Sequence, residues 1–511
     1  MGKRVEKLLI STFGFIPARI ALGALSLLGF ACLYMLRVNI SVAIVAMVRR
    51  NRTDVQAARA YCTEHVLADN ITAEDGNTTA TQGDDDSILL EDQGEMEWDE
   101  LTQGIMLSSY YYGYILTQII GGHLADLYGT RLMFGGCILS SGICTLLLPV
   151  AARTHNVAFI TLRAIIGFCS GVSWPSMHSM LTRWIPPLER PRFIAIVYFA
   201  SSLSVTFTLP MCGLVIDLYG WASAFYLTGM LSVAWCILWF PLMHDNPAQH
   251  PRIKSEELSY IKVALAAGGS SKTSSKKVPW RQILTSLPVW AAVVADSGNT
   301  FGLTLFLTQL PTYMKNILGF SIKKNGLLSG LPFLSRYIGA LTCSTIADWL
   351  LGRGYLSIVN TRRIFSAFAM LVPAVLLIIV AYSGCNAPLV VVLLCLSMFF
   401  NGGSPASILV NSTDIAPNYS GTLFGIGNTF ASLASLIAPL AAGAITEDQK
   451  TMGQWQKVFW MCIPVYGLAD LFFLIFCSGT IQPWNYAGQE YQGSPNEAEK
   501  IIAPKQQEES S

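Results

Sequence analysis

The sequence predicts an all-α membrane protein, with twelve transmembrane helices in two pseudo-symmetric six-helix halves. Composition is the first observation, because the 511 residues are 52% hydrophobic, only 13% charged, and have a mean hydropathy of +0.47. Such values are typical of polytopic membrane proteins. The second observation is a series of about twelve apolar stretches, each with the roughly 20 residues needed to cross a hydrocarbon core. The third is a long polar segment that divides these stretches six and six.

Short polar segments separate the predicted spans. The spans cover residues 18–48, 102–125, 132–151, 157–182, 193–216, 222–243, 287–314, 325–350, 363–383, 388–413, 421–446 and 457–478. The same pattern gives five regions, namely a cytoplasmic N-terminus (1–17), an N-terminal half (18–243), a cytoplasmic linker (244–286), a C-terminal half (287–478) and a cytoplasmic tail (479–511).

Loop charges predict the orientation, because Lys and Arg in short loops are retained on the cytoplasmic side. Basic residues precede the first span, follow the second and fourth, and fill the linker, so both termini are predicted to be cytoplasmic. The polar loop at about residues 50–100 then faces outward or into a lumen, and it carries glycosylation sequons at Asn51, Asn70 and Asn77. We therefore expect a multi-pass glycoprotein of the plasma membrane or of an endolysosomal or vesicular membrane.

Composition and motifs also argue against several classes of function. The formal net charge of +1 gives no basic surface for nucleic acid. No G-x-S-x-G, P-loop or paired-His motif stands out, so we expect no enzyme activity, no catalytic residues, no metal site and no cofactor. We expect a monomer surrounded by the lipid bilayer.

The stretch GGHLADLYGTR, after the second span, supplies four candidate residues: Gly122, Asp126, Gly129 and Arg131. It resembles the loop motif of the major facilitator superfamily, and CSTIADWLLGRG after span eight is a looser echo of it. The resemblance implies two six-helix repeats with substrate between them. It also implies a conformational latch formed by the Asp and the Arg. The alternative is a plain turn with a surface ion pair of little energetic weight.

A narrower resemblance rests on LRVNISVAIVAMV, SMH, RWIPPLERPRF, GWASAFYLTG, DIAPNYSGTLFGIGN and QPW. These stretches are similar to the anion:cation symporter family, which comprises the sialin, vesicular glutamate transporter and type I sodium-phosphate cotransporter group. The resemblance implies a small anionic substrate and a coupling ion, Na⁺ or H⁺.

Arg37 is the first candidate for the substrate site. It lies about 18 Å along the helix from Arg49, too far for its side chain to reach the membrane surface. Arg at a helix centre costs about 2.5 to 3.5 kcal/mol on insertion scales, so it needs a watered cavity or a partner. The family resemblance implies contact with the anion, and the alternative is an ion pair with another span. Arg163 and Tyr114 also match family positions. For Arg163 gating and structural roles stay open, and for Tyr114 helix packing does.

The chain departs at Ser170 from the pattern of the family that it resembles. Sialin-like and vesicular glutamate members usually carry Glu there, so proton coupling through this position is not available. Leu107 and Asn299 stand where vesicular glutamate transporters have His and Arg. These departures favour the phosphate-transporter side of the family.

Two mid-span charges, Asp296 and Arg336, are not expected from the family. One interpretation is a mutual ion pair that neutralises both. The other is that Asp296 binds the driving cation with help from Asn299 and Thr300, while Arg336 gives the C-terminal half its own anion contact.

Other residues within the spans carry weaker signals. Asn411 is a weaker candidate for the cavity, and Asp470 is an intramembrane carboxylate without an assigned role. Two small-residue motifs predict close helix contacts, at Gly167-x-x-x-Gly171 and Gly421-x-x-x-Gly425.

Together these features predict a secondary active transporter of inorganic phosphate or small organic anions, coupled to Na⁺ or driven by the membrane potential, that works by alternating access. One alternative is a proton-coupled lysosomal exporter of sialic acid or acidic metabolites, with Asp296 in place of the missing Glu. An alternative of another class is a receptor or scaffold that transports nothing. Loss of Arg37 or of the loop motif would have favoured that class, and both are present.

Overall fold

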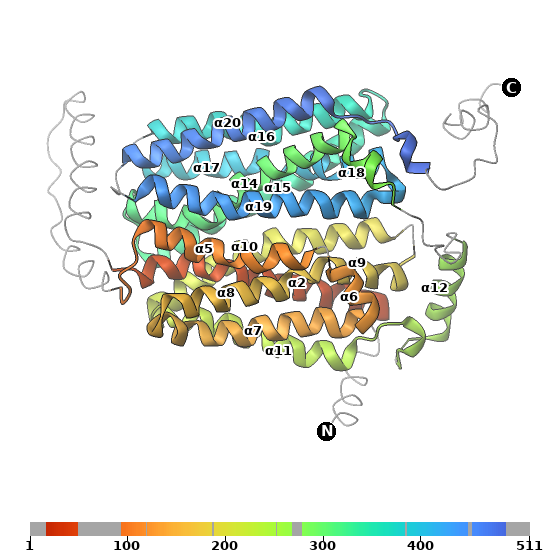
Figure 1. Ribbon diagram of the computed structural model, residues 1–511, viewed down its shortest axis with the longest axis horizontal. Helices are drawn as coiled ribbons and strands as arrows, with labels where there is room; N and C mark the ends of the chain where they lie inside the picture. The colour runs from red at the N-terminus through yellow and green to blue at the C-terminus, as the bar shows by residue number, and fades with distance from the viewer. Residues whose placement is uncertain are drawn as a thin grey trace.

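The computed structural model describes most of the chain outside its ends and the long first loop. The described residues are 17–49, 94–118, 120–186, 189–251, 253–267, 278–383, 386–447 and 452–486. The three predicted sequons at Asn51, Asn70 and Asn77 lie outside them. Figure 1 shows the helices in two layers, with the first half of the chain (red to yellow-green) below the second (green to blue).

Helices occupy all the predicted spans, and three spans are each divided between two helices. The N-terminal half contains α2 (Ala18–Met47), α5 (Glu100–Gln118), α6 (Gly121–Tyr128), α7 (Thr130–Thr154), α8 (Asn156–Gly171), α9 (Ser173–Trp184), α10 (Arg190–Tyr219) and α11 (Ala222–Leu242). The linker carries α12 (Ser255–Ala267) and α13 (Trp280–Leu284). The C-terminal half contains α14 (Leu287–Asn316), α15 (Ile322–Gly352), α16 (Ile358–Tyr382), α17 (Ala387–Asn401), α18 (Ile408–Ile415), α19 (Ser420–Thr446) and α20 (Met452–Phe476).

Nine helical stretches in the described part of the chain are long and apolar enough to cross a membrane. The long helices α5, α14 and α15 are the more polar ones, because α5 carries a run of Ser and Tyr and the other two carry mid-helix charges. Since a helix exposed to lipid on all sides must be apolar, this composition indicates that these three helices face the interior.

The two halves repeat the same helix packing. In the first half α5 packs on α8, α7 on α11, and α2 on α10 and α11. In the second half α15 packs on α17, α16 on α20, and α14 on α19 and α20. The contacts between the halves are also paired, with α10 against α15 and α19 against α5. This is the arrangement expected of two six-helix repeats related by a pseudo-two-fold axis.

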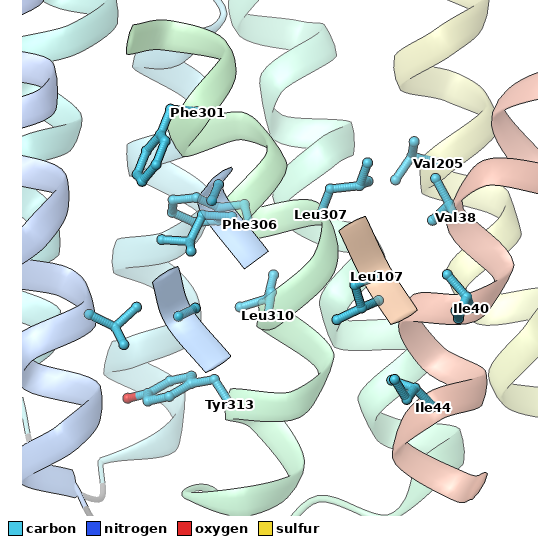
Figure 2. Close-up of a cluster of buried hydrophobic side chains, with 14 of the residues drawn as sticks. Val38, Ile40, Ile44, Leu107, Val205, Phe301, Phe306, Leu307, Leu310 and Tyr313 are labelled. Atoms are coloured by element: carbon cyan, nitrogen blue, oxygen red, sulfur yellow. The ribbon is translucent and has the colours of Figure 1, made fainter. Parts of the chain in front are cut away.

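The bundle has two different ends, which we name by their sequence features. The loop end is where α2 ends and α5 begins, and the motif end carries GGHLADLYGTR. At the loop end an apolar cluster joins the halves. Figure 2 shows Leu107 of α5 between Leu310 of α14 and Ile40 of α2, with Leu307 of α14 pointing toward Val38 of α2. Burial of such side chains away from water or lipid headgroups holds the halves together at this end.

Glycines bring the halves into backbone contact at the same end. A Cβ on Gly104 of α5 would lie 2.8 Å from the Pro439 carbonyl oxygen of α19, and one on Gly443 would lie 2.6 Å from the Glu100 carbonyl oxygen. Small residues of this kind allow helices in membranes to approach closely. The halves are therefore closed against each other at the loop end.

The linker helix α12 attaches to the N-terminal half at the motif end (Figure 1). Glu257 accepts hydrogen bonds from the backbone N–H groups of Ala18 and Arg19 at 3.0 and 3.1 Å, and so caps the start of α2. The Arg19 guanidinium also pairs with Glu257 at 3.2 Å and with Glu189 at 2.8 Å.

Candidate functional site

Arg37 lies at the middle of α2 in a cluster of tyrosines. Its side chain is half-buried, and Nη2 donates a 2.6 Å hydrogen bond to the hydroxyl of Tyr111. The guanidinium carbon lies 4.9 to 6.0 Å from the ring centroids of Tyr111, Tyr110, Tyr34 and Tyr114, within cation–π range. Among the described residues no carboxylate pairs with Arg37. The alternative of a structural ion pair is therefore not realised in this conformation.

The sequence of α5 explains the cluster. In its YYYGY run, Tyr110 and Tyr114 are one turn apart and share a face, and their rings stack at 5.4 Å. Tyr111 meets Tyr110 edge to face, also at 5.4 Å. Tyr114 is only 6% exposed, so it packs behind the ring of Tyr110 and forms part of the wall around Arg37.

Arg163 of α8 lies beside Arg37, where it supports the backbone of α2. It is 1% exposed, and it donates to the carbonyl oxygens of Leu36 and Arg37 at 3.2 and 3.4 Å. The side chain of Arg163 therefore points into the bundle against α2 and not toward the membrane surface. In this conformation Arg163 is inaccessible to a substrate and positions Arg37.

Ser170 occupies the position where the family resemblance leads us to expect Glu. Its hydroxyl donates to the carbonyl oxygen of Ile166 at 2.7 Å, lies 3.5 Å from that of Ser141, and is 3% exposed. The position is therefore a neutral, buried contact between α8 and α7.

Arg336 of α15 connects the two halves through a chain of polar side chains. Its Nε donates to Asn401 Oδ1 at 2.9 Å, and its Nη1 donates to the Ser202 hydroxyl of α10 at 3.1 Å. Asn401 in turn donates to Asn299 Oδ1 at 2.8 Å. Asn299, predicted to assist Asp296, thus belongs to the Arg336 network.

Asp296, three residues before Asn299 on α14, lines a small cavity of about 30 Å³ between α14, α18 and α19. Ser412 shares the cavity, and the other lining side chains are apolar. Among the described residues Asp296 makes no hydrogen bond and no ion pair, so the interpretation of a pair with Arg336 is wrong for this conformation. Within the described part Thr300 makes no hydrogen bond to Asp296 either. Of the three residues predicted to bind the cation, Asp296, Asn299 and Thr300, it is Asp296 that lines the cavity.

Asn411 and Asp470 are both fully buried. Asn411 donates to the Ser478 carbonyl oxygen at 2.8 Å, which ties α18 to the segment after α20. In this conformation the side chain of Asn411 is enclosed at the motif end, and its contact with substrate stays a prediction. Neither carboxylate oxygen of Asp470 has a hydrogen-bond partner among the described residues.

The loop motif fastens the start of α7 to the end of α11. Gly129 adopts a φ of 86°, and a Cβ there would lie 2.7 Å from Asp245 Oδ2. The N–H of Arg131 donates to Asp245 Oδ1 at 2.8 Å, while its guanidinium donates to a backbone carbonyl of α11. The side-chain contacts of Asp126 and the surroundings of Gly122 lie outside the described set. Asp245 is a partner that the sequence reasoning missed.

Another missed pair stabilises the C-terminal half. Arg362 holds Asp414 in a two-point ion pair at 2.7 and 3.3 Å, and it also donates to the Ala406 carbonyl oxygen at 2.8 Å. Both side chains are largely buried. Both residues belong to recognisable patterns in the sequence, because Asp414 begins DIAPNYSG and Arg362 is the first of two adjacent arginines. Neither pattern indicates that the two residues pair with each other.

Comparison with known proteins places this arrangement in a family. Residues 26–439 match the profile described as Major Facilitator Superfamily. Sialin from Homo sapiens is 38% identical over 469 residues, which cover 91% of this chain and 90% of sialin. A putative inorganic phosphate cotransporter from Drosophila ananassae is 36% identical, with 93% and 96% covered. Vesicular glutamate transporter 1 from Xenopus laevis is 33% identical, with 92% and 76% covered.

Solved structures share the fold at low sequence identity. A bacterial homologue of the human lysosomal transporter Spinster, in an inward-facing and unoccupied conformation, gives a TM-score of 0.64 at 11% identity and covers 91% of this chain and 99% of that one. A D-xylose-proton symporter gives 0.58 at 15% identity, with 88% and 97% covered. The predicted fold is thereby confirmed. The chain belongs to the Major Facilitator Superfamily, in the anion:cation symporter group with sialin, the putative inorganic phosphate cotransporters and the vesicular glutamate transporters.

Proposed function

We propose that this protein is a secondary active transporter of inorganic phosphate or a small organic anion, coupled to Na⁺ or driven by the membrane potential. The observation that carries the proposal is Arg37, a mid-span guanidinium that keeps partial exposure and has tyrosines around it. A charge held in this way needs a counter-ion. A planar guanidinium offers two parallel donors to a phosphate or carboxylate.

Arg336 supports the proposal from the other half. It is also half-buried at mid-span, and its described contacts are neutral side chains, Asn401 and Ser202. A substrate between Arg37 and Arg336 would touch both halves, as alternating access at a repeat interface requires. The names of relatives, which include putative inorganic phosphate cotransporters, suggest the substrate class.

Asp296 is the residue we assign to the coupling cation. Its carboxylate lines a cavity with room for a water molecule or a small ion. The cavity lies on α14, as does Asn299 of the Arg336 network. Movement of α14 would therefore couple cation binding to the anion site.

Alternating access follows from the two ends of the bundle. The apolar cluster and the contacts of Gly104 and Gly443 close the loop end, so we assign the access route to the motif end. We place that end in the cytoplasm with both termini, and the loop at about residues 50–100, glycosylated at its three sequons, on the opposite side. Rocking of the halves would then involve Asp126 and Arg131 as a latch.

Uptake into proteoliposomes tests this function. A panel of labelled anions, including phosphate, is compared for the wild type and Arg37→Ala, with Na⁺ present or replaced by choline. Arg353→Ala, at the exposed end of α15, is the matched control for loss of a positive charge. We expect saturable uptake that Arg37→Ala abolishes and Arg353→Ala retains. Uptake by Arg37→Ala equal to that of the wild type would refute the assignment of Arg37 to the substrate site. Uptake unchanged when choline replaces Na⁺ would exclude coupling to Na⁺.

Proton-coupled export of sialic acid or another acidic metabolite is the second candidate, favoured by the identity with human sialin. Asp296 would carry the proton, because Ser170 cannot. In that case a pH gradient accelerates flux and Asp296→Asn removes the acceleration. Flux that does not respond to the gradient excludes this candidate.

A further inference from the structure

Positive charge dominates the space between the halves. Arg37 and Arg163 come from the N-terminal half and Arg336 from the C-terminal half. The ring centroids of four tyrosines lie within 6.0 Å of the Arg37 guanidinium carbon, and the described hydrogen bonds of Arg336 go to the neutral side chains of Asn401 and Ser202. Arg163 adds its own charge beside Arg37. Among the described residues no carboxylate balances these three guanidinium groups.

Two of the three cations are accessible, and one residue relates them to each other. Arg37 and Arg336 are half-buried, whereas Arg163 is enclosed. Tyr34 of α2 lies 5.6 Å from the Arg37 guanidinium. Arg336 binds Ser202 of α10, and two residues later Ser204 of α10 donates to the carbonyl oxygen of Ala31, one turn before Tyr34. The two accessible guanidinium groups therefore flank one region beside Tyr34.

The carboxylates of the C-terminal half do not neutralise this region. Asp296 faces the separate cavity formed with α18 and α19. Asp470 is fully buried within its own half, one residue after Ala469, which packs against Gly298 of α14. The accessible charge between the halves is thus +2, from Arg37 and Arg336.

Both guanidinium groups also keep donors for a ligand. Within the described part Arg37 uses Nη2 for Tyr111, its Nε is buried without a partner, and its Nη1 has no partner and is the donor left for a ligand. Arg336 uses Nε for Asn401 and Nη1 for Ser202, which leaves Nη2. Each half can therefore donate hydrogen bonds to a shared anion.

We propose, building on the proposed function, that the transported anion is doubly charged and bridges Arg37 and Arg336. The class comprises divalent oxyanions and dicarboxylates. A dianion neutralises both guanidinium groups, whereas a monoanion leaves one of them unpaired in a region of low dielectric constant, at a cost in free energy. A bridging dianion also draws the halves together, because it accepts hydrogen bonds from Arg37 of one half and from Arg336 of the other.

Matched pairs of anions isolate the effect of charge. Sulfate and perchlorate are both tetrahedral and carry two charges and one, and succinate and its monoamide succinamate differ in the same way. Each is tested as an inhibitor of labelled phosphate uptake into proteoliposomes, and as a stabiliser of the purified protein against heat. The proteins are the wild type, Arg336→Gln, the conservative Arg336→Lys, and Arg353→Gln as a control for charge loss at an exposed position.

In the wild type and Arg353→Gln we expect the divalent member of each pair to bind more tightly by roughly tenfold or more, the weight of a charged hydrogen-bonded contact. In Arg336→Gln the preference should fall to near unity, and Arg336→Lys should restore part of it. The thermal assay reads the same preference if Arg336→Gln is folded but transports slowly.

If the wild type transports phosphate but binds the divalent and the monovalent anion of each pair equally well, the inference that the substrate is a dianion is refuted. The proposed function would still stand. Retention of the preference in Arg336→Gln would overturn the bridge. If no anion of the panel is transported by the wild type or stabilises it, the proposed function falls, and this inference falls with it.

Discussion

Closure of the loop end depends on Gly443, and one added methyl group should shift the balance between conformations. In Gly443→Ala the new Cβ would lie 2.6 Å from the Glu100 carbonyl oxygen and 3.4 Å from the Gly104 Cα. Backbone atoms on a packed helix cannot yield as a flexible side chain can. Forcing an extra methyl group into a packed contact costs about 1 to 3 kcal/mol. The cost applies only while the halves are closed at this end, so the closed state loses about 5- to 150-fold in population relative to the open one.

Labelling of a cysteine at the loop end measures that shift. Leu307 is 6% exposed in the apolar cluster between α14 and α2, so Leu307→Cys reports opening through its rate of reaction with a membrane-impermeant maleimide. We expect Gly443→Ala to raise this rate by the factor given above and to slow transport. Gly136→Ala is the matched control, because a Cβ on Gly136 of α7 meets nothing within 4 Å and gains the same helix propensity.

An unchanged labelling rate in Gly443→Ala would refute the reasoning, because it would mean that the helices separate without cost or that the loop end is not the closed end. An equal increase in Gly136→Ala would refute it as well. In that case the effect would come from helix propensity and not from contact between the halves.

Three further predictions concern stability and affinity. Asp414→Ala leaves the buried Arg362 guanidinium unpaired and should lower the free energy of unfolding by about 3 to 5 kcal/mol. The loss is measured as a lower unfolding midpoint in detergent, and an unchanged midpoint would show that the ion pair is dispensable. Tyr111→Phe removes the 2.6 Å hydrogen bond that orients Arg37, so KM for the anion should rise about 3- to 10-fold with little change in kcat, and an unaltered KM would contradict this role. Gly129→Ala places a residue with a side chain at a φ of 86°, where its Cβ meets the carboxylate of Asp245. The substitution should destabilise the protein by about 1 to 3 kcal/mol, measured by thermal unfolding, and a midpoint equal to that of Gly136→Ala would contradict this.

Hydropathy was enough to predict the spans, because a segment in lipid must be apolar and helical over a fixed length. Helix α14 was found despite Asp296, since its flanks are apolar and its length suffices. The division of span two into α5 and α6, and of span ten into α17 and α18, was not predicted. Such breaks depend on contacts with neighbouring helices, which hydropathy does not record.

The site was predicted in part, because sequence gives the chemistry of a residue but not the neighbour it meets. Arg37 could be identified from its cost in the membrane alone. Spacing suggested that Asn299 would join Asp296, yet Asn401 of α17, 102 positions later, binds it instead. The motif Gly167-x-x-x-Gly171 packs against α5 backbone as predicted.

The second motif, at Gly421 and Gly425, was predicted to pack in the same way, and this was wrong. A Cβ at either position would meet nothing within 4 Å. The same spacing therefore has different outcomes, because contact also requires a helix on that side of α19.

Counterflow of labelled phosphate tests the central claim, that Arg37 holds the transported anion, most directly. Proteoliposomes loaded with unlabelled phosphate, with the same Na⁺ concentration and pH on both sides, exchange it for label without any ion gradient, so the result does not require the coupling ion to drive transport. We predict a transient accumulation of label in the wild type and in Arg353→Gln, and none in Arg37→Gln. Accumulation by Arg37→Gln at the wild-type rate would contradict the account.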